Sequence, residues 1–174
     1  MGSIEALTTA TLLTGTVFGV LVPAWSAQAT TKEDVAINGR YRATSIGGMA
    51  KINDQYNNEP TVTAIWTVTS TCTTFDDCTG TVTSDQGWSA PLYTHDGDMW
   101  YVKHDVPNWE RCPDGTAYTG KQTYLFYRVD ESSGELKLGS PVLTGLDKTV
   151  GPSGACGQNK WLDIELPLRL DKLS

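Results

Sequence analysis

Basic residues are missing from the start of this chain, and runs of them are missing everywhere. The first Lys or Arg in the sequence is Lys32. Over the whole chain 13 basic residues stand against 20 acidic ones, which gives a formal net charge of −7. Phosphate binding needs clustered Lys and Arg, so this composition argues against nucleic acid as a partner and equally against attachment to anionic lipid. We interpret the acidity as a contribution to solubility.

Motifs for nucleophilic catalysis and for metal binding are missing as well. No Gly-x-Ser-x-Gly motif occurs, and the serines of Gly139-Ser140-Pro141 and Pro152-Ser153-Gly154 belong to turn sequences. The cysteines form no C-x2-C pair of the kind that binds zinc. Asp96-Gly97-Asp98 is too short for a calcium loop, and the other candidate acids also fall at turns. The sequence therefore predicts no catalytic residue, no metal and no cofactor.

An apolar segment opens the chain. From Ile4 to Trp25 its one charge is Glu5, and it ends Ala27-Gln28-Ala29, a pattern that a signal peptidase accepts. We expect residues 1–29 to be a cleaved signal peptide and residues 30–174 to form a single β domain. The missing basic start leaves an alternative, an uncleaved membrane anchor. Both predict a secreted or cell-envelope location outside the cytoplasm, where thiols oxidise.

Four cysteines lie beyond the opening segment, and we expect two disulfides. Cys72 and Cys78 are separated by five residues, a suitable length for closing the tip of a hairpin. That pairing leaves Cys112 with Cys156. In the chain-entropy model the short loop contributes about 2 kcal/mol to stability and the long loop about 4 kcal/mol. The second bridge is therefore expected to matter more to the fold.

The rest of the chain has the pattern of an all-β protein. In residues 61–70, Val62, Ala64, Trp66 and Val68 alternate with threonines, which is typical of a half-buried strand. Residues 162–170 alternate in the same way, although Pro167 marks an edge or a bulge. Residues 47–60, 106–119 and 144–159 show no strand pattern. About eight short strands linked by turns favour an antiparallel meander closed as a small barrel, with a β-sandwich as the alternative.

Each of the two histidines precedes an aspartate, in His95-Asp96 and His104-Asp105. A histidine oriented by a carboxylate is one half of a catalytic triad or of a metal site. If Asp96-Gly97 is the turn of a hairpin, His104 lies about 20 Å from it along the return strand. The two histidines would then share no site. A small hydrolase that uses one His/Asp pair is therefore the weakest of the functions considered.

Aromatic residues are the stronger indication of function. Trp100 and Tyr101 are adjacent in a predicted strand, so one of them faces the core and the other faces outward or lines a cavity. Trp109 and Arg111 belong to a loop that ends at Cys112, and both residue types are favoured in binding surfaces. The alternative for Trp109 is that it plugs one end of the barrel. Together with Trp88, these residues are our predicted contacts for a ligand or partner.

Several segments also carry a resemblance. They are Cys78-Thr79-Gly80-Thr81-Val82-Thr83-Ser84-Asp85-Gln86-Gly87-Trp88, Met99-Trp100-Tyr101-Val102, Val106-Pro107-Asn108-Trp109-Glu110 and Cys112-Pro113-Asp114-Gly115. Across roughly residues 39–161 the chain resembles small secreted proteins of mycobacteria and related actinobacteria. The resemblance implies an exported or cell-envelope location and carries over no catalytic residue.

These observations favour an exported, non-enzymatic protein of the cell envelope. We expect it to bind a protein partner or an apolar small molecule such as a lipid through its aromatic residues, since a small barrel can hold one ligand. The alternative is a sensory or adhesive ectodomain held by an uncleaved anchor, which would bring it to a membrane.

Overall fold

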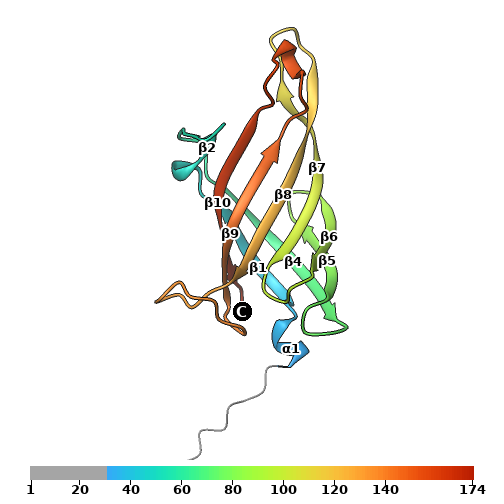
Figure 1. Ribbon diagram of the computed structural model, residues 1–174, viewed down its shortest axis with the longest axis vertical. Helices are drawn as coiled ribbons and strands as arrows, with labels where there is room; N and C mark the ends of the chain where they lie inside the picture. Colours follow the sequence, from blue (N-terminus) through green and yellow to red (C-terminus); the bar gives the residue numbers. More distant parts are fainter. Residues whose placement is uncertain (1–30) are drawn as a thin grey trace, which may run out of the picture.

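A computed structural model describes residues 31–174 (Figure 1). The predicted signal peptide or anchor, residues 1–29, lies outside the described residues. The elements, in chain order, are α1 (Lys32–Val35), β1 (Gly39–Ser45), η1 (Gly47–Met49), β2 (Lys51–Ile52), β3 (Gln55–Tyr56), β4 (Val62–Cys72), β5 (Cys78–Ser84), β6 (Ser89–Thr94), β7 (Trp100–Arg111), β8 (Ala117–Arg128), β9 (Val142–Val150), η2 (Ala155–Gly157) and β10 (Asp163–Lys172).

Eight antiparallel strands close into a barrel. Neighbours follow the order β1-β4-β5-β6-β7-β8-β9-β10. Strand β10 then pairs back onto β1, from Tyr41 opposite Lys172 to Ser45 opposite Leu168. This pairing confirms the predicted barrel and excludes the sandwich. The small strands β2 and β3 form a hairpin that extends the sheet from the side of β10, outside the closed ring.

The core fills the barrel because alternate side chains on each strand point inward. In β4, Ala64, Trp66 and Val68 are buried while the threonines between them are exposed, as their alternation predicts. Trp66 lies at the centre, with its ring edge-on to those of Trp88 and Tyr124. Trp100 and Phe126 are also almost fully buried. Burial of these large apolar side chains is the main stabilising term of the fold.

All three regions without a sequence pattern contain strands, the short β2 and β3 in residues 47–60 and longer ones in the other two, so that expectation was wrong. Strand β7 continues through Val106 to Arg111, and β9 occupies Val142–Val150. In β7 the ladder is interrupted by a bulge between Val106 and Glu110, where Asn108 has a φ of 55°. A bulge adds a residue to one strand and shifts its alternation. This shift explains why hydrophobic periodicity did not reveal the end of β7.

The remaining differences are local. Residues 136–138 contribute one isolated bridge, between Leu136 and Val129. Pro167 pairs with Leu146 of β9 on one side, and on its other side the ladder with β1 ends one residue later, at Leu168 opposite Ser45. The carbonyl of Pro167 accepts a hydrogen bond from Ile46 N–H at 2.8 Å. In a strand the N–H and the C=O of one residue point to the same side, so the nitrogen of Pro167 also faces Ile46, just beyond the end of β1 at Ser45. A proline is tolerated there because no ladder bond is lost.

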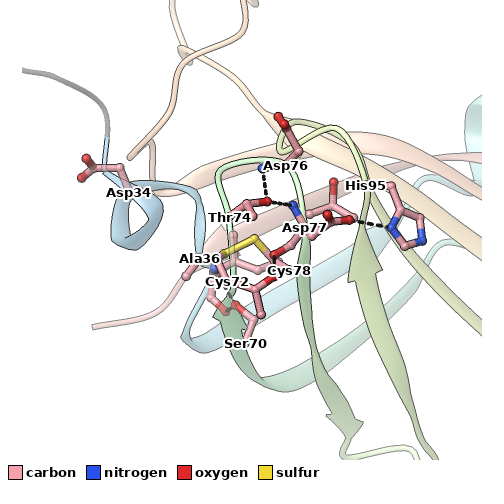
Figure 2. The surroundings of a disulfide bond; sticks show 12 residues. Asp34, Ala36, Ser70, Cys72, Thr74, Asp76, Asp77, Cys78 and His95 are labelled. Carbon is pink, nitrogen blue, oxygen red and sulfur yellow. Dashed lines mark hydrogen bonds and ion pairs between the residues drawn. A yellow bond between two sulfur atoms is a disulfide. The ribbon is translucent and has the colours of Figure 1, made fainter.

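Both predicted disulfides are present, one near each end of the barrel. At the lower end in Figure 1, Cys72–Cys78 joins opposed residues of β4 and β5. The turn between them is ordered by Thr74, whose hydroxyl accepts backbone N–H bonds from Asp76 and Asp77 (Figure 2). At the upper end, Cys112–Cys156 ties the β7–β8 hairpin to the segment between β9 and β10.

The segment before β1 closes the lower end of the barrel. Val35 and Ile37 are 3% and 1% exposed and belong to the core. Ile37 is held through its backbone, because its N–H donates to Ser70 Oγ and its carbonyl accepts from the same hydroxyl, both at 2.9 Å. The buried guanidinium of Arg128 donates to the carbonyl oxygens of Asp34 and Ala36. These bonds give partners to the backbone groups of the closing segment, of which those of Ile37 are buried.

Candidate functional site

The wall of the barrel has different heights on its two sides at the upper end. Strand β5 ends at Ser84 and β6 begins at Ser89, whereas β7 to β10 rise beyond them (Figure 1). Strand β6 pairs with β7 at two positions, Leu92 with Val102 and Tyr93 with Tyr101. Above these pairs β7 has no paired residue in β6, and the inner face of β7 and β8 lies next to the short β5–β6 turn. The first inner residues there are His104 and Gln122, which lie opposite each other.

Trp88, in the β5–β6 turn, lies over these inner residues. Its indole is stacked on the imidazole of His104, with ring centroids 4.2 Å apart and planes inclined by 16°. The same indole is nearly parallel to the ring of Tyr124 at 5.9 Å. Trp88 is half-buried and packs against the core. It therefore covers two neighbouring inner side chains of β7 and β8 from the low side of the wall.

A buried carboxylate lies behind this aromatic layer. Asp147, on β9, is 4% exposed, and it accepts hydrogen bonds from Ser45 Oγ at 2.6 Å and from Gln122 Nε2 at 2.7 Å. Among the described residues no Lys, Arg or His lies within ion-pair distance of it. Burial raises the pKa of Asp147 above its usual value, although the two hydrogen bonds and the nearby His104 oppose the change.

Two aromatic side chains beside Asp147, those of Tyr124 and His104, also carry polar groups in this site. Burial, with a smaller contribution from the charge of Asp147, raises the pKa of Tyr124 far above its usual value. The Nδ1 atom of His104 is 3.1 Å from the carbonyl oxygen of Asp105. Its Nε2 atom is buried and has no hydrogen-bond partner among the described residues.

The five predicted contact residues are distributed over the molecule. Trp88 belongs to the upper site, whereas Trp100 is a core residue with 1% exposure. Tyr101 lies outside the barrel, where its ring is stacked on that of Tyr93 at 5.5 Å. Arg111 is exposed on the upper hairpin. The structure therefore does not bring these residues into one surface, and their role as contacts stays a prediction.

Trp109 lies inside the upper hairpin. A Cβ atom at Gly120 would meet its ring at 2.8 Å and the methyl group of Thr149 at 2.7 Å. The ring therefore rests directly on the backbone of Gly120, beside the inner face of β8 and β9, and Gly151 gives it room on a second side. This placement favours the plug over the exposed contact.

The sequence pairs His95-Asp96 and His104-Asp105 are not side-chain pairs. His95 lies at the lower end, where its Nδ1 is 3.1 Å from Asp77 (Figure 2). The Asp105 carboxylate faces Lys121 instead of His104, at 2.7 Å. Residues 31–174 contain no cluster of ligating side chains that would hold a metal ion.

Sequence reasoning missed the residues at the heart of the upper site, namely Ser45, Gln122, Tyr124 and Asp147. The available signal was the spacing of Leu143, Gly145, Asp147 and Thr149, which have a period of two but vary in polarity. Such a strand fits a barrel interior that is apolar at one level and polar at another.

The fold and this site define a small antiparallel barrel that is closed by packing at one end and polar at the other. No protein-family model and no curated protein matches the chain. Several solved structures do match, and one is described as the monomer form of the M. tuberculosis PknI sensor domain. It is 13% identical with a TM-score of 0.52, over 80% of this chain and 88% of that chain. At this identity the likeness concerns the fold. In the described part of the chain, no helix is both long enough and apolar enough for a membrane span.

Proposed function

We propose that this chain is an extracytoplasmic binding domain of the sensor type, which takes up its ligand or partner at the upper end of the barrel. The observation that carries the proposal is the layered arrangement of Trp88 over His104 and Tyr124, in front of the buried Asp147. Binding sites typically combine aromatic surface with a few fixed polar groups. Here the wall is low on one side, and that low side is the route of entry.

The location outside the cytoplasm is supported by two independent features. All four cysteines of the chain are paired in disulfides, which persist in oxidising compartments. The sensor domain named above has the same fold. A role in sensing fits the anchored ectodomain considered from the sequence, and an exported binding protein fits the same site if residues 1–29 are cleaved.

A non-enzymatic role is part of the proposal. A hydrolase of the kind considered from the sequence needs a histidine held by a carboxylate. His104 is held by a backbone carbonyl and a stacked indole. The exposed His95 has Asp77 beside it, and no serine hydroxyl or thiol of residues 31–174 is bonded to its ring. Neither arrangement supports an activated nucleophile.

The test is a titration of the full chain, labelled on its indole and imidazole groups, with small aromatic, amine and carboxylic acid fragments, followed by NMR. We expect binding fragments to shift the signals of Trp88 and His104 and to leave Trp161 and His95 in place. Trp88→Ala and His104→Ala should each weaken the same binding. Fragments that bind a Trp88→Ala protein as well as the unchanged one, or that move only other signals, would overturn the proposal.

A native mass spectrum of the protein from its own host distinguishes an anchored ectodomain from an exported binding protein. Extra mass that leaves on denaturation identifies a carried ligand and its class. A mass that includes residues 1–29 assigns the site to an anchored ectodomain, whereas a mass that begins at Thr30 assigns it to an exported protein.

A further inference from the structure

A second place on the molecule has the chemistry of a binding site, and it is separate from the upper site. Among the exposed large apolar side chains of residues 31–174, Met49, Tyr56 and Val62 lie in or next to the stretch that carries β2 and β3, and Trp161 lies two residues before Asp163, which bonds to the turn of that hairpin. Exposed apolar groups that gather in one region mark an interaction surface more often than scattered ones do. The β2–β3 hairpin stands out from the barrel beside β10 (Figure 1).

A shallow pocket of about 420 Å³ lies on this hairpin. We call it the β2–β3 pocket, and it is lined by Ile52, Asn53, Gln55, Tyr56, Asn57 and Lys160. Tyr56 is 77% exposed, the highest value among the large apolar side chains of residues 31–174. Lys51 lies over its ring at 5.3 Å, and the half-exposed Trp161 follows Lys160 in the chain.

The hairpin that presents these side chains is fixed to the barrel. Asn53 and Asp54 occupy the left-handed region, with φ values of 48° and 69°, and form a tight turn. The backbone N–H of Asn53 donates to Asp163 O at 2.8 Å, and Asn53 Oδ1 accepts from Asp163 N–H at 3.1 Å. These two bonds join the turn to the start of β10. A pocket held in this way is preorganised, so binding there does not require the hairpin to become ordered.

The lining indicates the class of ligand. Side-chain amides both donate and accept hydrogen bonds, as sugar hydroxyls require, and an exposed aromatic ring packs against the C–H face of a pyranose. Gln55 makes no side-chain hydrogen bond within the described part of the chain, and Asn57 uses its Nδ2 for Glu59 at 2.7 Å but keeps its oxygen free. The pocket therefore offers the side-chain amide of Gln55 and the amide oxygen of Asn57 for hydrogen bonds, beside the exposed ring of Tyr56.

Other partners fit less well. A stable protein interface buries roughly 800 Å² on each side around an apolar centre, and this pocket is small and mostly polar. A lipid needs a continuous apolar face, whereas Ile52 is the one aliphatic residue of the lining. We propose that the β2–β3 pocket binds an oligosaccharide, with Tyr56 stacked on a sugar ring and Gln55 and Asn57 bonded to its hydroxyls.

The test is a titration of the isotope-labelled full chain with chitotetraose, cellotetraose and mannotetraose. We expect at least one of them to shift the backbone signals of residues 55–57 and the indole signal of Trp161 in a saturable way. Tyr56→Ala should weaken that binding roughly tenfold or more, because a central aromatic contact carries much of the energy of a small interface. Tyr56→Phe should retain most of it, since the ring remains.

The matched control is Phe75→Ala, which removes an aromatic side chain that is 55% exposed at the opposite end of the barrel. We expect it to leave sugar binding unchanged, as should Trp88→Ala in the upper site. The high exposure of Tyr56 means that Tyr56→Ala should unfold at the same urea concentration as the unchanged protein, so loss of binding reflects the contact.

Three results would overturn the proposal. They are shifts by none of the three sugars, binding that Tyr56→Ala leaves unchanged, and shifts of residues 55–57 by phospholipid vesicles or by an unfolded protein but by no sugar. None of these results bears on the upper site, which is tested through Trp88 and His104.

Discussion

The two ends of this barrel are closed in different ways. At the lower end the chain itself enters the core, with Val35 and Ile37 buried and Arg128 bonded to the backbone beside them. At the upper end the interior is polar, with Asp147 buried beyond ion-pair distance of any cation among residues 31–174 and Trp88 stacked on His104. Each end buries an ionisable group, Arg128 below and Asp147 above, and the apolar closure by Val35 and Ile37 belongs to the lower end. The comparison teaches that the lower end is closed by apolar packing of the chain itself, whereas the upper end carries the proposed binding site.

The largest effect is expected from the disulfides, which also differ between the ends. The double change Cys112→Ala with Cys156→Ala opens a loop with a sequence separation of 44 residues, against 6 for Cys72 and Cys78. Removal of the upper bridge should lower the free energy of unfolding by about 4 kcal/mol and removal of the lower one by about 2 kcal/mol. Urea unfolding of the oxidised proteins measures both. Equal losses would contradict this difference between the ends.

A change in the packing at each end should give the next largest effect. Ile37→Ala leaves a cavity among fully buried residues and should cost about 3 kcal/mol. Trp88→Ala removes a larger side chain, but one that is half-buried, and should cost roughly 1–2 kcal/mol. Thermal and urea unfolding of the two variants measure the comparison. If Trp88→Ala is the more destabilising, the indole is a structural element of the core and not a cover.

The two ends should also respond to acid with opposite signs. Burial raises the folded-state pKa of Asp147 above its unfolded-state pKa. The stabilisation that Asp147 contributes through protonation is therefore complete below the unfolded-state pKa and is lost as the pH rises through the folded-state pKa. Asp96, at the lower end, is the reverse case. Partial burial opposes the change, but hydrogen bonds from Met99, Thr94 and Asp98 lower its pKa, so its stabilisation is lost as pH falls.

The measurement is urea unfolding between pH 7 and acid pH for the unchanged protein, Asp147→Asn and Asp96→Asn. As the pH falls through the folded-state pKa of Asp147 toward its lower unfolded-state pKa, the unchanged protein should gain stability relative to Asp147→Asn, by at most about 1.4 kcal/mol per pH unit. It should lose stability relative to Asp96→Asn at lower pH. A difference from Asp147→Asn that does not vary with pH would show that this carboxylate is not perturbed by its burial.

The sequence revealed the strands of the barrel where their inner faces are uniformly apolar. The alternation of Ala64, Trp66 and Val68 places β4 correctly because threonines fill the outer face. The inner face of β9 carries Gly145 and Asp147 among apolar residues, so periodic hydrophobicity fails there although the strand is regular.

The upper site was hidden for a related reason. The partners of Asp147 are Ser45 and Gln122, which lie 102 and 25 residues away in the chain and meet only because the barrel closes. No local pattern marks a hydrogen bond between strands so far apart. Trp88 could be proposed from its residue type, but its stacking on His104 depends on the relative heights of β6 and β7.

The two histidines give the smallest effect on stability and the sharpest comparison between the ends. The side chain of His95 is 72% exposed, and its pairing with Asp77 is an ion pair of the surface type, so His95→Ala should change the free energy of unfolding by less than about 0.5 kcal/mol. His104→Ala removes the ring under Trp88 and should therefore alter the fluorescence of the indole, which His95→Ala leaves unchanged. If fragment binding at the upper site is lost in His104→Ala and kept in His95→Ala, the site is confined to the open end. A hydrolytic activity that disappears in either variant would instead show that the protein is an enzyme. Neither stacking by His104 nor a surface contact of His95 would account for the loss of such an activity.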